Sequence, residues 1–161
     1  MKQGEIYFVS GIDTDIGKSY ATGYIAKTWN GQGRRTITQK FIQTGNTEIS
    51  EDILRHRQIA GTGLLPEDLC GDTMPEIFTY PASPHLASRI DGRPIDFAKI
   101  EEAQDRLRQR FDALLVEGAG GLMVPLTDRM LTIDYVAHRN LPLILVTSPR
   151  LGLSLIHICP C

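Results

Sequence analysis

The sequence has few cysteines, no excess of basic charge and no long apolar segment. Its three cysteines, Cys70, Cys159 and Cys161, are too few and too unevenly placed for a disulfide framework or a closed zinc site. The net charge is −2, so the chain lacks the basic footprint that binding to nucleic acid or anionic membranes would leave. No apolar window approaches the length of a membrane span, and the N-terminus lacks the apolar stretch of a signal peptide. We therefore expect a cytoplasmic protein whose partners are small molecules or proteins.

The sequence does contain a regular alternation of short apolar runs and helical patterns. Its 161 residues, 42% of them apolar, suit one domain with a real core. The apolar runs predict buried parallel strands over residues 6–10, 35–40, 113–120 and 141–148, and the helical patterns cover residues 17–30, 51–60, 96–111 and 130–139. This order predicts a three-layer α/β fold, with a mostly parallel sheet and helices on both faces. Residues 61–85 hold four of the nine prolines, which indicates an irregular excursion.

The loop after the first predicted strand, "GIDTDIGKS" at residues 11–19, has the residues of a phosphate site. Ligands of open parallel sheets bind beyond the carboxyl ends of the strands. A phosphate site needs glycines that let backbone amides face the anion, a lysine that balances charge and a hydroxyl that meets a bound Mg²⁺. Gly17, Lys18 and Ser19 supply all three. However, five residues separate Gly11 and Gly17, where the common loop has four, so an ordinary strand-to-helix turn stays possible.

Four further polar residues fall on the same edge of the predicted sheet. Lys40 and Thr44 follow the second strand, Glu117 ends an otherwise apolar strand before a glycine-rich turn, and Asp52 lies in the first turn of a helix. Alone, each has a plain explanation: a solvated lysine, an acidic turn, or a carboxylate that complements a helix dipole. Together they favour a ligand site. No structural partner for Lys40 is evident in the sequence, so we expect it to contribute to chemistry more than to folding.

From Ile6 to about Gly152 the chain resembles the dethiobiotin synthetases of biotin biosynthesis. Their first loop has the form Gly-x-Asp-Thr-x-x-Gly-Lys-[Thr/Ser], with the same five-residue spacing as "GIDTDIGKS". The stretch "QKFIQTG" is similar to the second family motif, and "VEGAGGLMVPL" is similar to the third, which is the most specific. The segments "YPASPHLASRIDGRPI" and "LPLILVTSPRLG" resemble two further parts of the family. The resemblance implies a fold like that of the phosphate-loop (P-loop) nucleoside triphosphatases.

The resemblance also implies a ligase that closes the ureido ring of dethiobiotin from 7,8-diaminononanoate, CO₂ and MgATP, with release of ADP and phosphate. Lys18 and Lys40 are the implied catalytic residues, and Thr44 is implied to bind the substrate. Ser19, Asp52 and Glu117 are the implied Mg²⁺ ligands, and a homodimer is implied for the full-length enzyme. The implied ATP-binding residues are Thr14, Asp15, Ile16, Gly17, Lys18, Ser19, Asp52, Glu117, Gly118, Ala119 and Gly120.

Two other kinds of ATP-dependent protein stay open as alternatives. The amide synthetases of corrin biosynthesis have a similar loop, but they also carry a glutaminase domain for which this chain has no room. The ATPase switches of chromosome partitioning place a second lysine five residues before the loop lysine. Here that position is Asp13, so the switch lacks its signature residue.

Residues 153–161, "LSLIHICPC", do not resemble the family. Family members continue after a pair like Leu151-Gly152 with a helix that opens near an Asn-His pair, whereas "LSLIHI" is similar to the peptide read from a common transposon adaptor. We therefore expect one ATP-binding ligase domain over residues 1–152, followed by a non-native tail at 153–161. Since the sheet would then be incomplete on its C-terminal side, we expect the 161-residue chain alone to be poorly soluble and to make no dethiobiotin.

Overall fold

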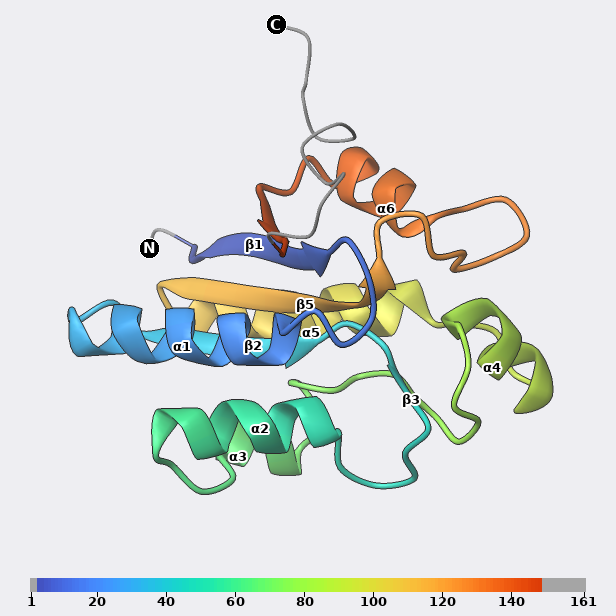
Figure 1. Ribbon diagram of the computed structural model, residues 1–161. Coiled ribbons are helices and arrows are strands. Elements are labelled where there is room, and N and C mark those ends of the chain that lie inside the picture. The colour runs from blue at the N-terminus through green and yellow to red at the C-terminus, as the bar shows by residue number, and fades with distance from the viewer. Residues whose placement is uncertain (1–2, 149–161) are drawn as a thin grey trace, which may run out of the picture.

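The computed structural model describes residues 3–148, and its centre is a four-stranded parallel sheet (Figure 1). The strands are β1 (Glu5–Gly11), β2 (Thr36–Lys40), β5 (Ala113–Gly121) and β6 (Leu143–Val146). They lie in the order β2-β5-β1-β6, and every neighbouring pair is parallel. The four predicted strands are confirmed, with ends shifted by one or two residues. Helices cover both faces of this sheet, which is why the strands read as nearly continuous apolar runs.

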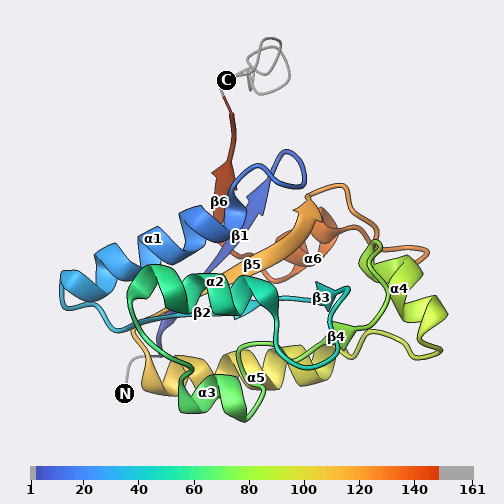
Figure 2. The ribbon, with the colours of Figure 1, turned by 60° about the horizontal axis from the view of Figure 1, so that its bottom comes forward.

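Two groups of helices make the outer layers of the predicted three-layer fold (Figure 2). Helix α1 (Lys18–Gly31) packs on one face of the sheet, against Val9 and Leu115, and α2 (Glu51–Ala60) lies beside α1 and against β2. Helices α5 (Phe97–Arg110) and α6 (Thr132–His138) cover the other face, where Phe8 and Leu114 are buried. Because successive strand residues point to opposite faces, neighbours such as Phe8 and Val9 feed two separate cores.

The helix ends follow from local side-chain and backbone chemistry. The Ser50 hydroxyl accepts a hydrogen bond from the amide of Ile53 at the start of α2, and Gly61 ends this helix with a φ of 75°. Asp96 caps α5 in the same way, through the amide of Lys99. Helix α2 spans the predicted residues 51–60, and the other three predicted helices are confirmed with ends that differ by one or two residues.

The region predicted as an irregular excursion contains short regular elements, so that interpretation is partly wrong. It holds α3 (Pro66–Leu69) and β4 (Ile77–Phe78), and α4 (Pro84–Ile90) begins at its end. Strand β4 pairs in parallel with β3 (Gln43–Thr44), which forms a second small sheet. Figure 1 shows β3 and α4 at the end of the molecule toward which β5 points. The excursion therefore forms one wall of the space beyond the strand ends.

Some predictions concern residues that are not described. The domain boundary at residue 152 and the tail at 153–161 lie outside residues 3–148. Among the described helices, none is both long and apolar enough to cross a lipid bilayer.

Candidate nucleotide site

The loop between β1 and α1 leaves the first amides of the helix free to bind an anion. Gly17 precedes α1 with a φ of 95°, and no side chain caps the helix or adds a negative charge to its first turn. Asp15 also has a left-handed backbone, with a φ of 56°. A Cβ atom on Gly11 would lie 2.6 Å from Cγ2 of Ile16, so only glycine fits at the start of this turn. Uncapped amides and the helix dipole together favour a bound phosphate.

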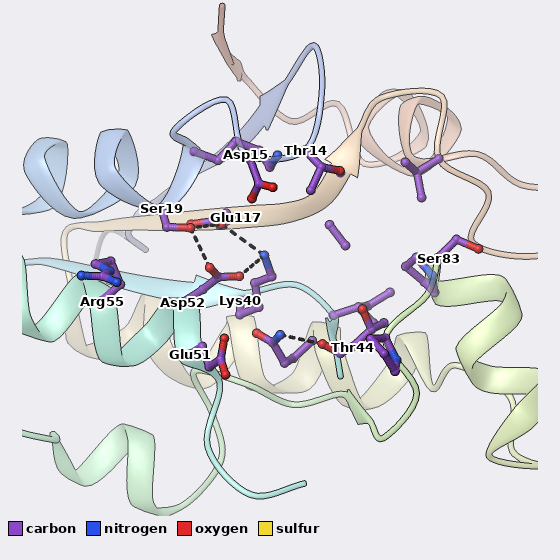
Figure 3. A pocket seen from close by; sticks show the side chains of 18 of the residues that line it. Thr14, Asp15, Ser19, Lys40, Thr44, Glu51, Asp52, Arg55, Ser83 and Glu117 are labelled. Carbon is purple, nitrogen blue, oxygen red and sulfur yellow. Dashed lines mark hydrogen bonds and ion pairs between the residues drawn. The ribbon is translucent and has the colours of Figure 1, made fainter. Parts of the chain in front are cut away.

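Four side chains from four different elements meet beside this loop (Figure 3). The hydroxyl of Ser19, on α1, lies 2.6 Å from Oδ1 of Asp52, on α2, and 2.9 Å from Oε1 of Glu117, on β5. Nζ of Lys40, at the end of β2, lies 3.1 Å from the same Glu117 oxygen and also pairs with Asp52. Strands β2 and β5 are paired with Lys40 beside Glu117, so the register of the sheet itself places this ion pair at the end of β2, four residues before β5 ends at Gly121.

The charges in this cluster shift one another's protonation. Burial alone would raise the pKa of Glu117, but the Lys40 ammonium and a hydrogen bond from His56 outweigh it and lower that pKa to about 2. Burial disfavours the charged form of Lys40, but the Glu117 and Asp52 carboxylates outweigh it and raise the pKa of Lys40. Glu117 is thus a carboxylate and Lys40 an ammonium at neutral pH.

Lys18 supplies a second positive charge at the mouth of the loop. Its Nζ donates a hydrogen bond of 2.7 Å to the backbone carbonyl of Asp13, within the loop itself. Burial and the nearby Lys40 charge lower the pKa of Lys18. Lys18 and Lys40 thus place two buried ammonium groups beside the free amides of the loop, an arrangement that suits an anionic ligand.

A cavity of about 780 Å³ opens at this cluster and extends toward β3 and α4. Its volume is in the range of small-molecule and cofactor sites. Most of the sequence-predicted site residues line it, namely Thr14, Asp15, Gly17, Lys18, Ser19, Lys40, Thr44, Asp52, Glu117, Ala119 and Gly120. Two other predicted site residues, Ile16 and Gly118, do not line the cavity. Gly118 instead packs against the core, since a Cβ atom there would lie 2.9 Å from Cε1 of Phe8, and its carbonyl accepts a hydrogen bond from Lys40.

The oxygen atoms of Ser19, Asp52 and Glu117 could hold Mg²⁺ together with a nucleotide. The Ser19 hydroxyl has one hydrogen but faces two carboxylate oxygens, so acceptors outnumber hydrogens at this point. Oxygen atoms that lack a hydrogen-bond donor suit Mg²⁺ as ligands, because this hard cation binds one or two carboxylates and completes its shell with water and phosphate oxygens. Among residues 3–148, no group of three or more His, Cys, Asp or Glu side chains is arranged to bind a metal ion by itself.

Sequence reasoning missed His56 and Arg55. His56 is 1% exposed, and its Nε2 lies 2.7 Å from Oε2 of Glu117. Arg55 lines the cavity, with its guanidinium over the ring of Tyr20. The available signal for His56 was its position four residues after Asp52, which places both side chains on one face of a helix.

The structure also corrects one premise about Lys40. No partner is evident in the sequence, yet its side chain is only 7% exposed and pairs with Asp52 and Glu117. Removing one member of a buried ion pair leaves a buried charge without its partner. Lys40 therefore contributes to stability as well as to the site.

A parallel sheet whose first strand turns through a glycine-rich, lysine-bearing loop into an uncapped helix defines a P-loop nucleotide-binding protein. Sequence comparison agrees with this class, since the chain matches a family model described as an AAA domain over residues 5–158. It is 54% identical to the ATP-dependent dethiobiotin synthetase BioD 2 of Haemophilus ducreyi, over 92% of this chain and 71% of that protein. The protein of the same name from Haemophilus influenzae is 51% identical, over 92% and 78%. The chain belongs to the ATP-dependent dethiobiotin synthetase family.

The similarity to dethiobiotin synthetases extends to a more distant relative. The ATP-dependent dethiobiotin synthetase BioD 1 of Escherichia coli is 35% identical over 91% of this chain and 65% of that protein. The corrin amide synthetases and the partitioning switches that the loop alone left open are not favoured by these relatives.

Proposed function

We propose that the protein catalyses the ATP-dependent closure of the ureido ring of dethiobiotin, from 7,8-diaminononanoate and CO₂, with release of ADP and phosphate. Membership of the dethiobiotin synthetase family supports this activity. The observation that carries it is the meeting of Ser19, Lys40, Asp52 and Glu117 at one point beside the phosphate loop. These side chains suit a reaction in which a phosphoryl group passes from ATP to an anionic acceptor.

The reaction begins with a carbamate formed on one amine of the substrate. ATP phosphorylates this carbamate, and the neighbouring amine attacks the mixed anhydride, which closes the ring and releases phosphate. Negative charge gathers on the transferred phosphoryl group and the carbamate oxygens. The task of the protein is to position these groups and neutralise their charge.

In this proposal the amides from Thr14 to Lys18 hold the ATP phosphates. Mg²⁺, held by Ser19, Asp52 and Glu117, supplies charge neutralisation at the phosphate oxygens when it is bound. Lys18 and Lys40 provide fixed ammonium groups on the remaining sides of the γ-phosphate and the carbamate.

Thr44 binds the diamine at the far side of the cavity. It ends β3, and its carbonyl accepts a hydrogen bond from the side-chain amide of Gln43, so its position is fixed locally. The backbone of Ala119 and Gly120 borders the nucleotide from β5. The same proposal includes a homodimer as the active form and a domain that spans residues 1–152.

The test measures ATP turnover with and without 7,8-diaminononanoate, in the presence of Mg²⁺ and bicarbonate. The expectation that the 161-residue chain makes no dethiobiotin by itself remains a prediction. The assay therefore compares that chain with a chimera in which the C-terminal part of the Haemophilus ducreyi relative follows residue 148. Turnover of the chimera that depends on the diamine supports the proposal. Turnover that is the same without the diamine would instead favour an ATPase switch.

A further inference from the structure

The two carboxylate oxygens of Glu117 serve different sides of the site. Oε1 faces the cavity, where the Ser19 hydroxyl lies 2.9 Å away and Nζ of Lys40 donates to it at 3.1 Å. Oε2 points the other way and lies 2.7 Å from Nε2 of His56. His56 and Glu117 are each only 1% exposed, so water does not compete for this contact.

The other nitrogen of His56 is held by a directed chain of hydrogen bonds. Nη1 of Arg57 donates to Oγ1 of Thr38 at 2.9 Å, and that hydroxyl lies 3.0 Å from Nδ1 of His56. The Thr38 hydroxyl accepts from Arg57 through one lone pair, and its own hydrogen can point at Nδ1. Oε2 of Glu117 belongs to a carboxylate and can only accept, so Nε2 carries the proton of this contact and donates it to Glu117. Every group in this chain is satisfied with a single set of hydrogen positions.

The far end of the chain is fixed in place. The Arg57 guanidinium pairs with both oxygens of Asp68, at 2.8 Å and 2.7 Å, in a buried and bidentate contact. Asp68 also accepts from the hydroxyl of Thr73 and from the amide of Leu65. Bidentate pairs of this kind set geometry as well as energy. The segment around α3 thus supports the histidine through Arg57.

We propose that His56 is a positioning residue, which holds Oε2 of Glu117 so that Oε1 faces Ser19 and Lys40 in the nucleotide site. The last torsion of a glutamate side chain has a broad, roughly two-fold preference, so a carboxylate without such a donor can turn its plane. His56 removes that freedom. The importance of this for nucleotide binding rests on the proposed function, whereas the hydrogen-bond arrangement itself does not.

A matched pair of substitutions separates the two contacts of the ring. The amide nitrogen of glutamine can occupy the place of Nε2 and donate to Glu117, whereas asparagine reaches only the place of Nδ1, beside Thr38. We expect His56→Asn to weaken MgATP binding about tenfold, the usual effect of losing one charge-assisted hydrogen bond. The MgATP affinity of His56→Gln should stay within about threefold of that of the protein without substitution. The control is Gln104→Leu, which removes a buried hydrogen bond to Gln39 on the opposite face of the sheet and should leave MgATP affinity unchanged.

A purely structural histidine would give a different result. The two variants would then lose affinity in proportion to their loss of melting temperature, and glutamine would give no rescue. That outcome would overturn the proposal.

The ¹⁵N spectrum of the His56 ring gives a readout that needs no nucleotide. We expect a slowly exchanging proton on Nε2, where the ring meets Glu117. A proton on Nδ1 with a bare Nε2 would overturn the proposal. A protein that binds no MgATP but shows the Nε2 proton would contradict the proposed function, while it supports the positioning of Glu117.

Discussion

Replacing Glu117 by glutamine removes one buried charge while the side-chain volume stays nearly the same. Burial would raise the pKa of this carboxyl, yet Lys40, His56 and Ser19 lower it from 4.5 to about 2. A shift of this size corresponds to about 3 kcal/mol of folding free energy at neutral pH. We therefore expect Glu117→Gln to lower the free energy of unfolding by about 3 kcal/mol at pH 7.

The pH dependence of this loss is the sharper part of the prediction. A lowered carboxyl pKa stabilises the fold above the ordinary value of 4.5, and that stabilisation disappears as the pH falls toward 2. The difference between the parent and Glu117→Gln should therefore shrink by roughly 1 kcal/mol between pH 7 and pH 3.5. Denaturant unfolding at these pH values can follow the fluorescence of Trp29, the single tryptophan of the chain.

The control for this experiment is Glu102→Gln, on the exposed face of α5. Glu102 is 74% exposed and faces Arg106 at 3.9 Å, so its loss should change the free energy of unfolding by less than about 0.5 kcal/mol. The reasoning is refuted if Glu117→Gln costs less than about 1 kcal/mol at pH 7. A cost that does not change with pH would refute it equally.

Three more variants probe other parts of the site. Lys40→Met should reduce turnover by orders of magnitude in the chimera. It should also lower the free energy of unfolding by about 3 kcal/mol, because it leaves buried carboxylates unpaired; an inactive variant with unchanged stability would contradict this expected loss of stability. Ser19→Ala should abolish the increase in ATP affinity that Mg²⁺ gives the parent, as titration calorimetry with and without Mg²⁺ can show. Gly118→Ala should cost about 1–3 kcal/mol in a melting experiment because its Cβ meets Phe8, whereas Gly31→Ala, with open space around it, should not destabilise.

The main sheet and its helices could be predicted because their signals are local. Buried parallel strands leave apolar runs, and Ser50 and Asp96, which cap α2 and α5 in the structure, are residue types that favour helix starts. The short elements between residues 61 and 85 could not be predicted in this way. Two-residue strands such as β3 and β4 are too short to have a periodicity. Helix α3 is a single turn that begins at Pro66 and is held by the buried ion pair of Arg57 and Asp68, which no periodic pattern indicates.

The candidate site shows the same division between local and long-range information. Lys18 and Ser19 come after the loop that follows β1, and Glu117 lies in the second half of β5, so the rule that ligands bind beyond the carboxyl ends of parallel strands indicates one site for them without knowledge of their contacts. The partners of Lys40 and the role of His56 depend on contact between the segment that holds both residues and the distant strand β5, because Glu117 lies 77 residues from Lys40 and 61 residues from His56 in the chain. No pattern within either segment indicates that contact.

The most direct test of the proposed activity is to follow labelled carbon from ¹³C-bicarbonate into product. With MgATP and 7,8-diaminononanoate, the chimera should form dethiobiotin that carries one labelled ring carbon, and one ADP should appear for each product molecule. Mass spectrometry of the product and a coupled assay for ADP give both quantities. ADP release without labelled dethiobiotin, or at the same rate without the diamine, would contradict the proposal that this site closes a ureido ring.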